Sequence, residues 1–223
     1  MPPTTATAKQ PSQARRASLI AAALALAAEQ SPASVTTAQL AAAIGVTQGA
    51  VFRHFESKEA IWLAVLETGS TQLLAKLRAA ANAHNNALEA LRAVFDAHVA
   101  FIVAHPGMPR LMLQELQHPH ETALRRQVSH LMAAYRQLLK DLLNKAMANG
   151  QIQPETDLQA ASVLFVGSIQ GLVIQSLLAG QLGAIGKQAP AVFALFRSAI
   201  TAQSTAPSPP AVKPRHRRPS TQP

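Results

Sequence analysis

Residues 47–58 carry side chains that suit contacts with a nucleic acid. Gln48 offers an amide that can bind the edge of an adenine, and Arg53 can reach a guanine or a phosphate. Gly49 and Ala50 are small, so a helix that bears them can sit close to the base pairs, and Ala50 can contact a thymine methyl group. This set predicts a surface that reads DNA, although Arg53 alone also fits a solvated surface charge.

Two short helices joined by a tight turn would be needed to present these side chains at a fixed angle. The segment 36–55 reads TTAQLAAAIGVTQGAVFRHF. Thr36 and Gln39 have the spacing of a capping box, and Gly45 stands where the turn needs a positive φ. The positions expected to hold the helices together and to form their core are Leu40, Ala41, Ile44, Val46, Val51, Phe55 and Trp62. This arrangement is typical of a helix-turn-helix that enters the major groove.

Extended to AQLAAAIGVTQGAVFRHFESKEAIW, this segment resembles the TetR family of bacterial regulators. The resemblance covers about residues 13–73 and rests on Thr37, Leu40-Ala41, Gly45-Val46-Thr47, Phe52, His54-Phe55 and Ser57-Lys58-Glu59. Phe52 departs from the Tyr that is usual in the family, so one contact of a phenolic hydroxyl with phosphate is missing. The resemblance implies an all-α fold of about nine helices, with a three-helix DNA-binding domain followed by a larger domain for ligand binding and dimerisation.

The resemblance also implies roles for individual residues at the DNA. Thr36 and Thr37 would offer hydroxyl and backbone N–H groups to a phosphate, and His54 and Lys58 match positions that grip phosphate. Phe52 would pack against sugar and backbone, with a place in the core as the alternative. The complete set of expected DNA contacts is Thr36, Thr37, Thr47, Gln48, Gly49, Ala50, Phe52, Arg53, His54 and Lys58.

Residues 85–202 fit the family in outline only. The resemblance implies that the last two long helices form a dimer and that this domain holds a ligand. The expected dimer interface consists of Leu164, Gly167, Gly171, Leu172, Ile174 and Leu178. The expected pocket lining consists of Phe95, Val99, Ile102, Leu113, Leu116, Tyr135, Leu139, Phe165 and Ile169. An apolar lining of this kind favours a lipophilic inducer, although each residue also suits a plain core.

Hydrophobic periodicity and caps predict helices at about residues 12–30, 37–44, 47–55, 57–83, 87–104, 109–117, 120–149, 155–179 and 190–202. Residues 1–11 and 203–223 are expected to be disordered. The tail contains Lys213, Arg215, Arg217 and Arg218 without an acidic residue. It is therefore either a solvated terminus or an additional, sequence-independent grip on phosphate.

The composition narrows the class of protein. The chain has 20 basic and 11 acidic residues, and a formal charge of +9 favours a polyanionic partner. The charge is spread along the chain, so a membrane-surface protein would also fit. The absence of cysteine excludes disulfides and a Cys-based zinc site, and it fits a reducing cytoplasm. We expect no bilayer-spanning segment, since Ser and Gln interrupt the longest apolar run, at 163–178.

No glycine-rich phosphate loop, nucleophile motif or paired carboxylates stand in the sequence, so we expect neither an enzyme nor a cofactor. The cluster His118-Pro119-His120-Glu121 lacks a complete ligand set, so no metal site is expected. The expected partners are a palindromic operator in double-stranded DNA, a small-molecule inducer and a second copy of the chain, without a membrane, at the nucleoid of a bacterial cytoplasm. The alternative is a DNA-binding protein of the same fold that acts through a protein partner or as an activator, without an inducer.

Overall fold

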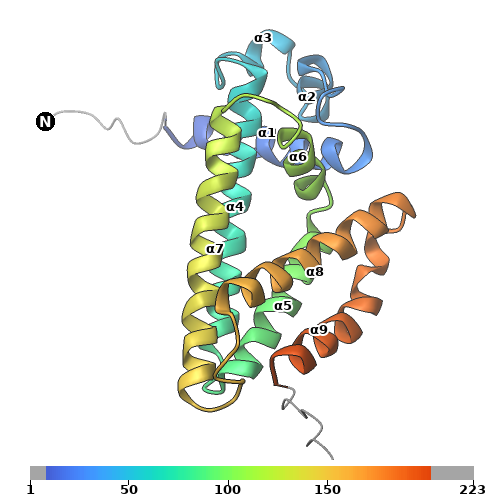
Figure 1. Ribbon diagram of the computed structural model, residues 1–223. Coiled ribbons are helices and arrows are strands. Elements are labelled where there is room, and N and C mark those ends of the chain that lie inside the picture. Colours follow the sequence, from blue (N-terminus) through green and yellow to red (C-terminus); the bar gives the residue numbers. More distant parts are fainter. Residues whose placement is uncertain (1–8, 202–223) are drawn as a thin grey trace, which may run out of the picture.

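The computed structural model describes residues 9–201, and this part of the chain folds into nine α-helices and no strand (Figure 1). The all-helical class, with an N-terminal helix-turn-helix and a larger helical domain behind it, is confirmed. The helices are α1 (Lys9–Glu29), α2 (Thr37–Ala43), α3 (Gln48–Val51), α4 (Lys58–Asn82), α5 (Ala87–Ala104), α6 (Gly107–Glu115), α7 (Ala123–Ala148), α8 (Leu158–Leu178) and α9 (Ile185–Thr201). A short 3₁₀ helix, η1 (Leu182–Ala184), precedes α9.

Four of the long helices begin where a side chain accepts a backbone N–H that would otherwise lack a partner. Ser57 caps α4, Asn86 caps α5, Thr122 caps α7 and Asp157 caps α8. In each case the oxygen of the cap accepts from an N–H two or three residues further on, at 2.8–3.1 Å. These caps explain why α5 spans the predicted residues and why α7 begins at Ala123, three residues after the predicted His120.

The helix ends around the N-terminal domain differ from the prediction. α1 begins at Lys9, so the disorder expected for 1–11 is wrong for 9–11. Pro11 lies in the first turn, where its missing N–H removes no helical hydrogen bond. α3 ends at Val51, because the N–H of Arg53 and that of His54 bond three residues back, at 3.3 and 3.0 Å, and so tighten the chain into a turn.

Two later helices begin earlier than predicted. α6 starts at Gly107 instead of Pro109, and α9 starts at Ile185 instead of Pro190. Pro190 lies inside α9, where it cannot donate to the carbonyl of Gly186. Both residues are exposed, so water can satisfy that carbonyl and the helix continues through the proline.

The helices of the second domain surround one apolar core. α4 packs against α5 and α7, and α5 also packs against α9, while α8 covers α7 and α9 (Figure 1). Aromatic side chains meet at its centre, where the ring centroids of Phe95 and Phe165 lie 5.3 Å apart and those of Phe95 and Phe193 also 5.3 Å. α1 packs against α4 and α6, which joins the two domains.

α8 is the helix that bears on the expectation that no segment spans a bilayer. It has 21 residues and a mean hydropathy of 1.7, so by length and composition alone it is apolar enough to cross a membrane. Ser168, Gln170 and Gln175 interrupt the helix but do not lower its mean hydropathy below that of a membrane-spanning helix. A third of its most apolar window is buried inside the protein, on α7 and α9.

The ends of the chain lie outside the described residues. The prediction of a basic, disordered tail at 203–223 therefore stays a prediction, as does disorder at 1–8.

Candidate DNA-binding surface and ligand cavity

The turn between α2 and α3 has the geometry that the sequence predicts. Thr36 Oγ1 accepts from the N–H of Gln39 at 3.1 Å, and Gln39 Oε1 accepts from the N–H of Thr36 at 2.8 Å. Gly45 has φ of 66°, which favours glycine. Beneath the turn, Leu40, Val51 and Phe55 are buried, so α2 and α3 are fixed against the domain core. The core positions predicted for Phe55 and Trp62 are thus confirmed.

The predicted DNA contacts of α3 lie together on the outer surface of the protein. Thr47, Gln48, Gly49 and Arg53 are exposed, and Ala50 and His54 are half-buried. The side chain of Phe52 is 48% exposed, so it is not a core residue. An apolar ring of this size on an outer surface is available for contact with sugar and backbone, as expected.

Two of the predicted DNA-binding hydroxyls already have partners within the protein. Thr36 Oγ1 also donates to Gln39 Oε1 at 3.1 Å, so its hydroxyl hydrogen is used within the capping box. Gln48 Nε2 donates to Thr37 Oγ1 at 2.7 Å. This hydrogen bond fixes the orientation of the Gln48 amide before DNA arrives. It leaves the second Nε2 hydrogen and the carbonyl oxygen of Gln48, together with the Thr37 hydroxyl hydrogen, for DNA.

Lys58 holds the loop between α1 and α2. Its Nζ donates to the carbonyl oxygens of Ala33 at 2.9 Å and Val35 at 2.8 Å. One of its three N–H groups remains available for a phosphate. The resemblance implied a phosphate contact for this residue, and the structure adds an internal role that spacing along the sequence does not reveal.

Arg16 is a contributor that the sequence analysis missed. It donates from Nη1 to the carbonyl of His54, and its guanidinium lies 4.1 Å from the ring centroid of Phe55. These contacts tie α1 to the C-terminal end of the helix-turn-helix. The only sequence signal is a basic pair, Arg15-Arg16, which does not identify its partner.

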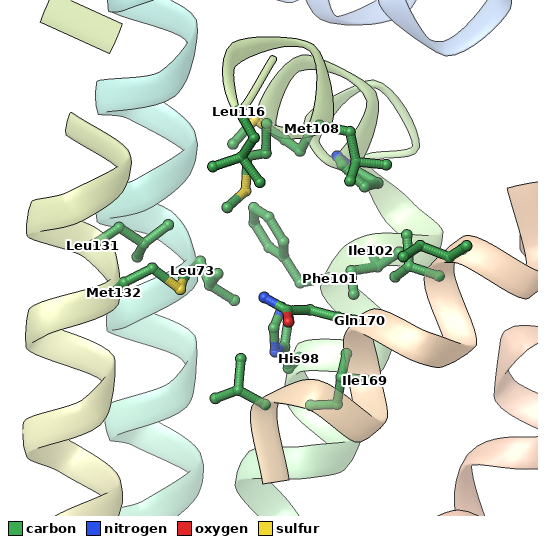
Figure 2. A pocket seen from close by; sticks show the side chains of 16 residues that line it. Leu73, His98, Phe101, Ile102, Met108, Leu116, Leu131, Met132, Ile169 and Gln170 are labelled. Atoms are coloured by element: carbon green, nitrogen blue, oxygen red, sulfur yellow. The ribbon is translucent and has the colours of Figure 1, made fainter. Parts of the chain in front are cut away.

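A cavity of about 240 Å³ lies between α4, α5, α6, α7 and α8 (Figure 2). Four of the nine residues predicted to line a pocket border it, namely Ile102, Leu113, Leu116 and Ile169. Leu73 and Met132 border it from α4 and α7. The cavity lies within the second domain, as the resemblance implied, but α4 also contributes to it.

The other five predicted pocket residues do not border this cavity. Phe95, Val99, Tyr135, Leu139 and Phe165 are buried core residues. Phe165 fills the space between α8 and α9. Its ring centroid lies 5.2 Å from that of Phe196 and 6.4 Å from that of Phe193. Apolar periodicity identifies residues that face inward, but it does not separate those that touch each other from those that border a void.

Two polar residues of the cavity were not predicted. His98 on α5 and Gln170 on α8 are the only lining side chains with a hydrogen-bonding nitrogen or oxygen within residues 9–201. His98 occurs in the sequence on an apolar helix, and Gln170 interrupts another. A polar residue inside an apolar helical pattern is the signal that identifies both.

α6 connects the cavity with the DNA-binding domain. Met108, Met112 and Leu116 border the cavity, while at the start of the same helix Gly107 packs on α1. A Cβ at Gly107 would lie 2.5 Å from the carbonyl oxygen of Leu24, so only glycine allows this approach. At the other end, Gln114 Oε1 accepts from the N–H of Ala33 at 2.7 Å, in the loop that Lys58 also holds.

α8 and α9 leave an apolar face uncovered. Of the six residues predicted for a dimer interface, Leu164, Gly167, Gly171, Ile174 and Leu178 are exposed, and Leu178 is 78% exposed. Leu172 is buried in the core, which corrects its assignment to that face. Leu195 on α9 is 73% exposed and extends the face.

Within residues 9–201, no three His, Asp or Glu side chains gather to hold a metal ion.

Comparison with known protein families covers both domains. Residues 19–65 match the family described as bacterial regulatory proteins, tetR family, and residues 87–192 match the tetracyclin repressor-like C-terminal domain. The chain belongs to the TetR family. It is thus a transcriptional regulator with a DNA-binding helix-turn-helix.

Curated relatives include nucleoid occlusion factors named SlmA. That of Vibrio vulnificus is 27% identical over 139 residues, which are 61% of this chain and 70% of the relative. That of Idiomarina loihiensis is 30% identical over 131 residues, which are 58% of this chain and 67% of the relative.

Solved structures of TetR-family proteins have the same fold. The transcriptional regulator FadR from Bacillus subtilis, in complex with stearoyl-CoA, has a TM-score of 0.72 at 21% identity, over 82% of this chain and 98% of FadR. The ketosteroid regulator KstR2 of Mycobacterium tuberculosis has a TM-score of 0.70 at 22% identity, over 85% of this chain and 96% of KstR2.

Proposed function

We propose that the protein is a dimeric repressor that binds a palindromic operator in the bacterial cytoplasm and leaves it when an apolar small molecule enters the cavity. The observation that carries this proposal is the position of α6. The same helix borders the cavity through Met108 and Met112 and contacts the DNA-binding domain through Gly107 and Gln114. A ligand that moves α6 must therefore disturb either α1 or the loop before α2.

The exposed face of α8 and α9 supports the dimer. Leu164 and Leu178 on α8 and Leu195 on α9 would face water in a single copy of the chain. Packing this face against a second copy would form a four-helix interface and bury apolar area. Two copies would also carry two recognition helices about 34–36 Å apart, the spacing that a palindrome requires.

The open cavity favours regulation by a ligand over the alternative in which the protein acts without an inducer. A core that had closed completely would leave no room for an inducer, whereas about 240 Å³ is open here. FadR, which has the same fold, is described in complex with stearoyl-CoA, and KstR2 is described as a ketosteroid regulator. Both names are consistent with a lipophilic ligand.

The curated relatives favour a second candidate function. They are named as nucleoid occlusion factors, which points to a DNA-bound protein that acts on another protein at the nucleoid. In that case the exposed apolar faces would serve a partner as well as the dimer, and no inducer would be needed.

Selection of binding sites from a random duplex library tests the main proposal, when it is followed by release assays with apolar compounds. We expect a palindrome to be enriched and at least one apolar compound to lower the affinity for it. Enrichment of a palindrome without release by any apolar compound would favour the second candidate. If no sequence were enriched, the role of the helix-turn-helix as a sequence reader would be contradicted.

A further inference from the structure

The polar groups of the cavity are few and lie together. His98 and Gln170 are at one end, between α5 and α8, while Leu116 and Met108 form the opposite end at α6 (Figure 2). Among the lining residues none is Asp, Glu, Lys or Arg. A ligand would therefore lie with its polar group against α5 and α8 and its apolar part toward α6.

The hydrogen bond of His98 with Tyr135 determines what the imidazole offers. The Tyr135 hydroxyl lies 3.1 Å from His98 Nδ1, and the tyrosine is fully buried. Burial raises the pKa of Tyr135, so its hydroxyl keeps its hydrogen and needs an acceptor. Nδ1 accepts that hydrogen, and a neutral imidazole then carries its own hydrogen on Nε2.

This second nitrogen is free to bind a ligand. Nε2 makes no hydrogen bond within residues 9–201, and the histidine borders the cavity. It thus presents an N–H donor, beside the amide of Gln170, which offers both a donor and an acceptor. The two groups match a carbonyl or hydroxyl oxygen.

From this pair we propose that the ligand is an uncharged apolar molecule whose one oxygen function, a ketone, ester or alcohol, binds His98 Nε2 and Gln170. The inference rests on the proposed function, because it concerns the same cavity.

A free carboxylate does not suit this site. No cation borders the cavity, so a carboxylate that exchanged water for this site would gain no counter-charge. His98 does not supply the charge, because burial lowers its pKa to about 4 and the ring is neutral at neutral pH. The size of the cavity also sets a limit, since about 240 Å³ is below the usual ligand-pocket range of about 300–1,000 Å³. A medium-chain compound fits better than a long one.

A matched series of probes tests the inference on the full chain. We would measure dissociation constants near neutral pH for 2-undecanone, decanoate and undecane by competition with a fluorescent apolar probe. We expect 2-undecanone to bind at least tenfold more tightly than decanoate and about tenfold more tightly than undecane. Decanoate binding as tightly as the ketone would overturn the proposal.

Variants connect this preference to the two residues. Two variants, His98→Phe on α5 and Gln170→Leu on α8, remove the polar groups one at a time. Each should reduce the advantage in affinity of the ketone over undecane to about threefold or less. His105→Phe is the matched control, because His105 lies at the C-terminal cap of α5, outside this cavity, and it should keep the full advantage. A full advantage in both the His98 and the Gln170 variants would overturn the proposal.

The same probes separate this inference from the proposed function. If they bind in the expected order but leave the affinity for the selected operator unchanged, the release function is contradicted and the ligand class stands. If decanoate both binds best and releases the operator, the ligand class is contradicted and the release function stands. Binding of none of the three would contradict the ligand class, and the release function would then be decided by the release assays with other apolar compounds.

Discussion

Several side chains that are expected to contact DNA also form hydrogen bonds within the protein. Thr36 is used in a capping box, Thr37 accepts from Gln48, and Lys58 binds two backbone carbonyls. Sequence spacing identified these positions as a group, because capping boxes and turn glycines act over three or four residues. It did not reveal the role of Lys58, whose partners lie 23 and 25 residues away.

Replacement of Lys58 by Met tests its internal role. Loss of two hydrogen bonds from a charged group should lower the free energy of unfolding by about 1–3 kcal/mol, measured by urea denaturation. DNA affinity should fall for all sequences alike, with a salt slope reduced by about one phosphate contact. Lys76→Met, at an exposed position of the same helix, should leave the stability unchanged. Unchanged stability with a salt slope reduced by about one phosphate contact would instead favour a purely DNA-binding role.

Gln48→Ala should change the sequence preference of the protein. We expect a loss of about 1–3 kcal/mol at one base pair of each half-site, measured by anisotropy with single-substituted duplexes. Thr37→Val is the control, since it removes the hydroxyl that orients the amide but keeps the amide itself. If Gln48→Ala kept the wild-type preference at every position, Gln48 would not be the reader.

His98 should make the stability depend on pH. Its pKa is 6.5 in a model peptide and about 4 when buried in the folded protein. Between these values the unfolded chain binds a proton that the folded protein does not, so stability rises with pH and is lost on acidification. From about pH 7.5 to about pH 5.5, the wild type should lose about 1 kcal/mol more than His98→Phe. Equal losses in the two proteins would show that His98 is not held neutral by burial.

At the scale of elements, α6 carries the connection between the two domains. Its close approach to α1 depends on Gly107, and its C-terminal end reaches Ala33 through Gln114. The sequence predicted α5 to the residue, since Asn86 and His105-Pro106 mark its ends. It placed α6 two residues late, because a helix that begins at a packed glycine has no capping side chain to mark it.

Gly107→Ala tests the contact between α6 and α1. The new Cβ would meet a backbone oxygen at 2.5 Å, so one helix must shift, at a cost of about 1–3 kcal/mol in unfolding free energy. Gly186→Ala, in α9, has nothing within 4 Å of the new Cβ and should leave the protein as stable or slightly more so. Equal melting temperatures for Gly107→Ala and the wild type would contradict the packing described for α6.

At the scale of the whole molecule, the proposed dimer depends on the exposed face of α8 and α9. The sequence identified most of this face from its small and apolar residues, but it could not tell Leu172 from its neighbours. α8 is apolar on nearly every side, so its periodicity does not show which residues face the core. Phe95, Tyr135 and Phe165 fill the core instead of bordering the cavity, because packing against other rings depends on three-dimensional positions that apolar periodicity does not show.

Leu164→Glu should separate the dimer. A charge on the apolar face would be buried in the interface without a partner, so sedimentation should report a monomer and operator affinity should fall. Val103→Glu is the matched control, because Val103 on α5 is 43% exposed and Leu164 is 47% exposed. A Leu164→Glu protein that sediments as a dimer would contradict this interface.

The role of this protein as a regulator depends on sequence-specific binding by α3. The most direct test compares the affinity for the selected duplex with that for a scrambled duplex of equal length, by fluorescence anisotropy at two salt concentrations. We predict that the selected duplex binds at least about 10³-fold more tightly, with one or two dimers per site and a steep salt dependence in both cases. Equal affinities for the two duplexes would contradict the account.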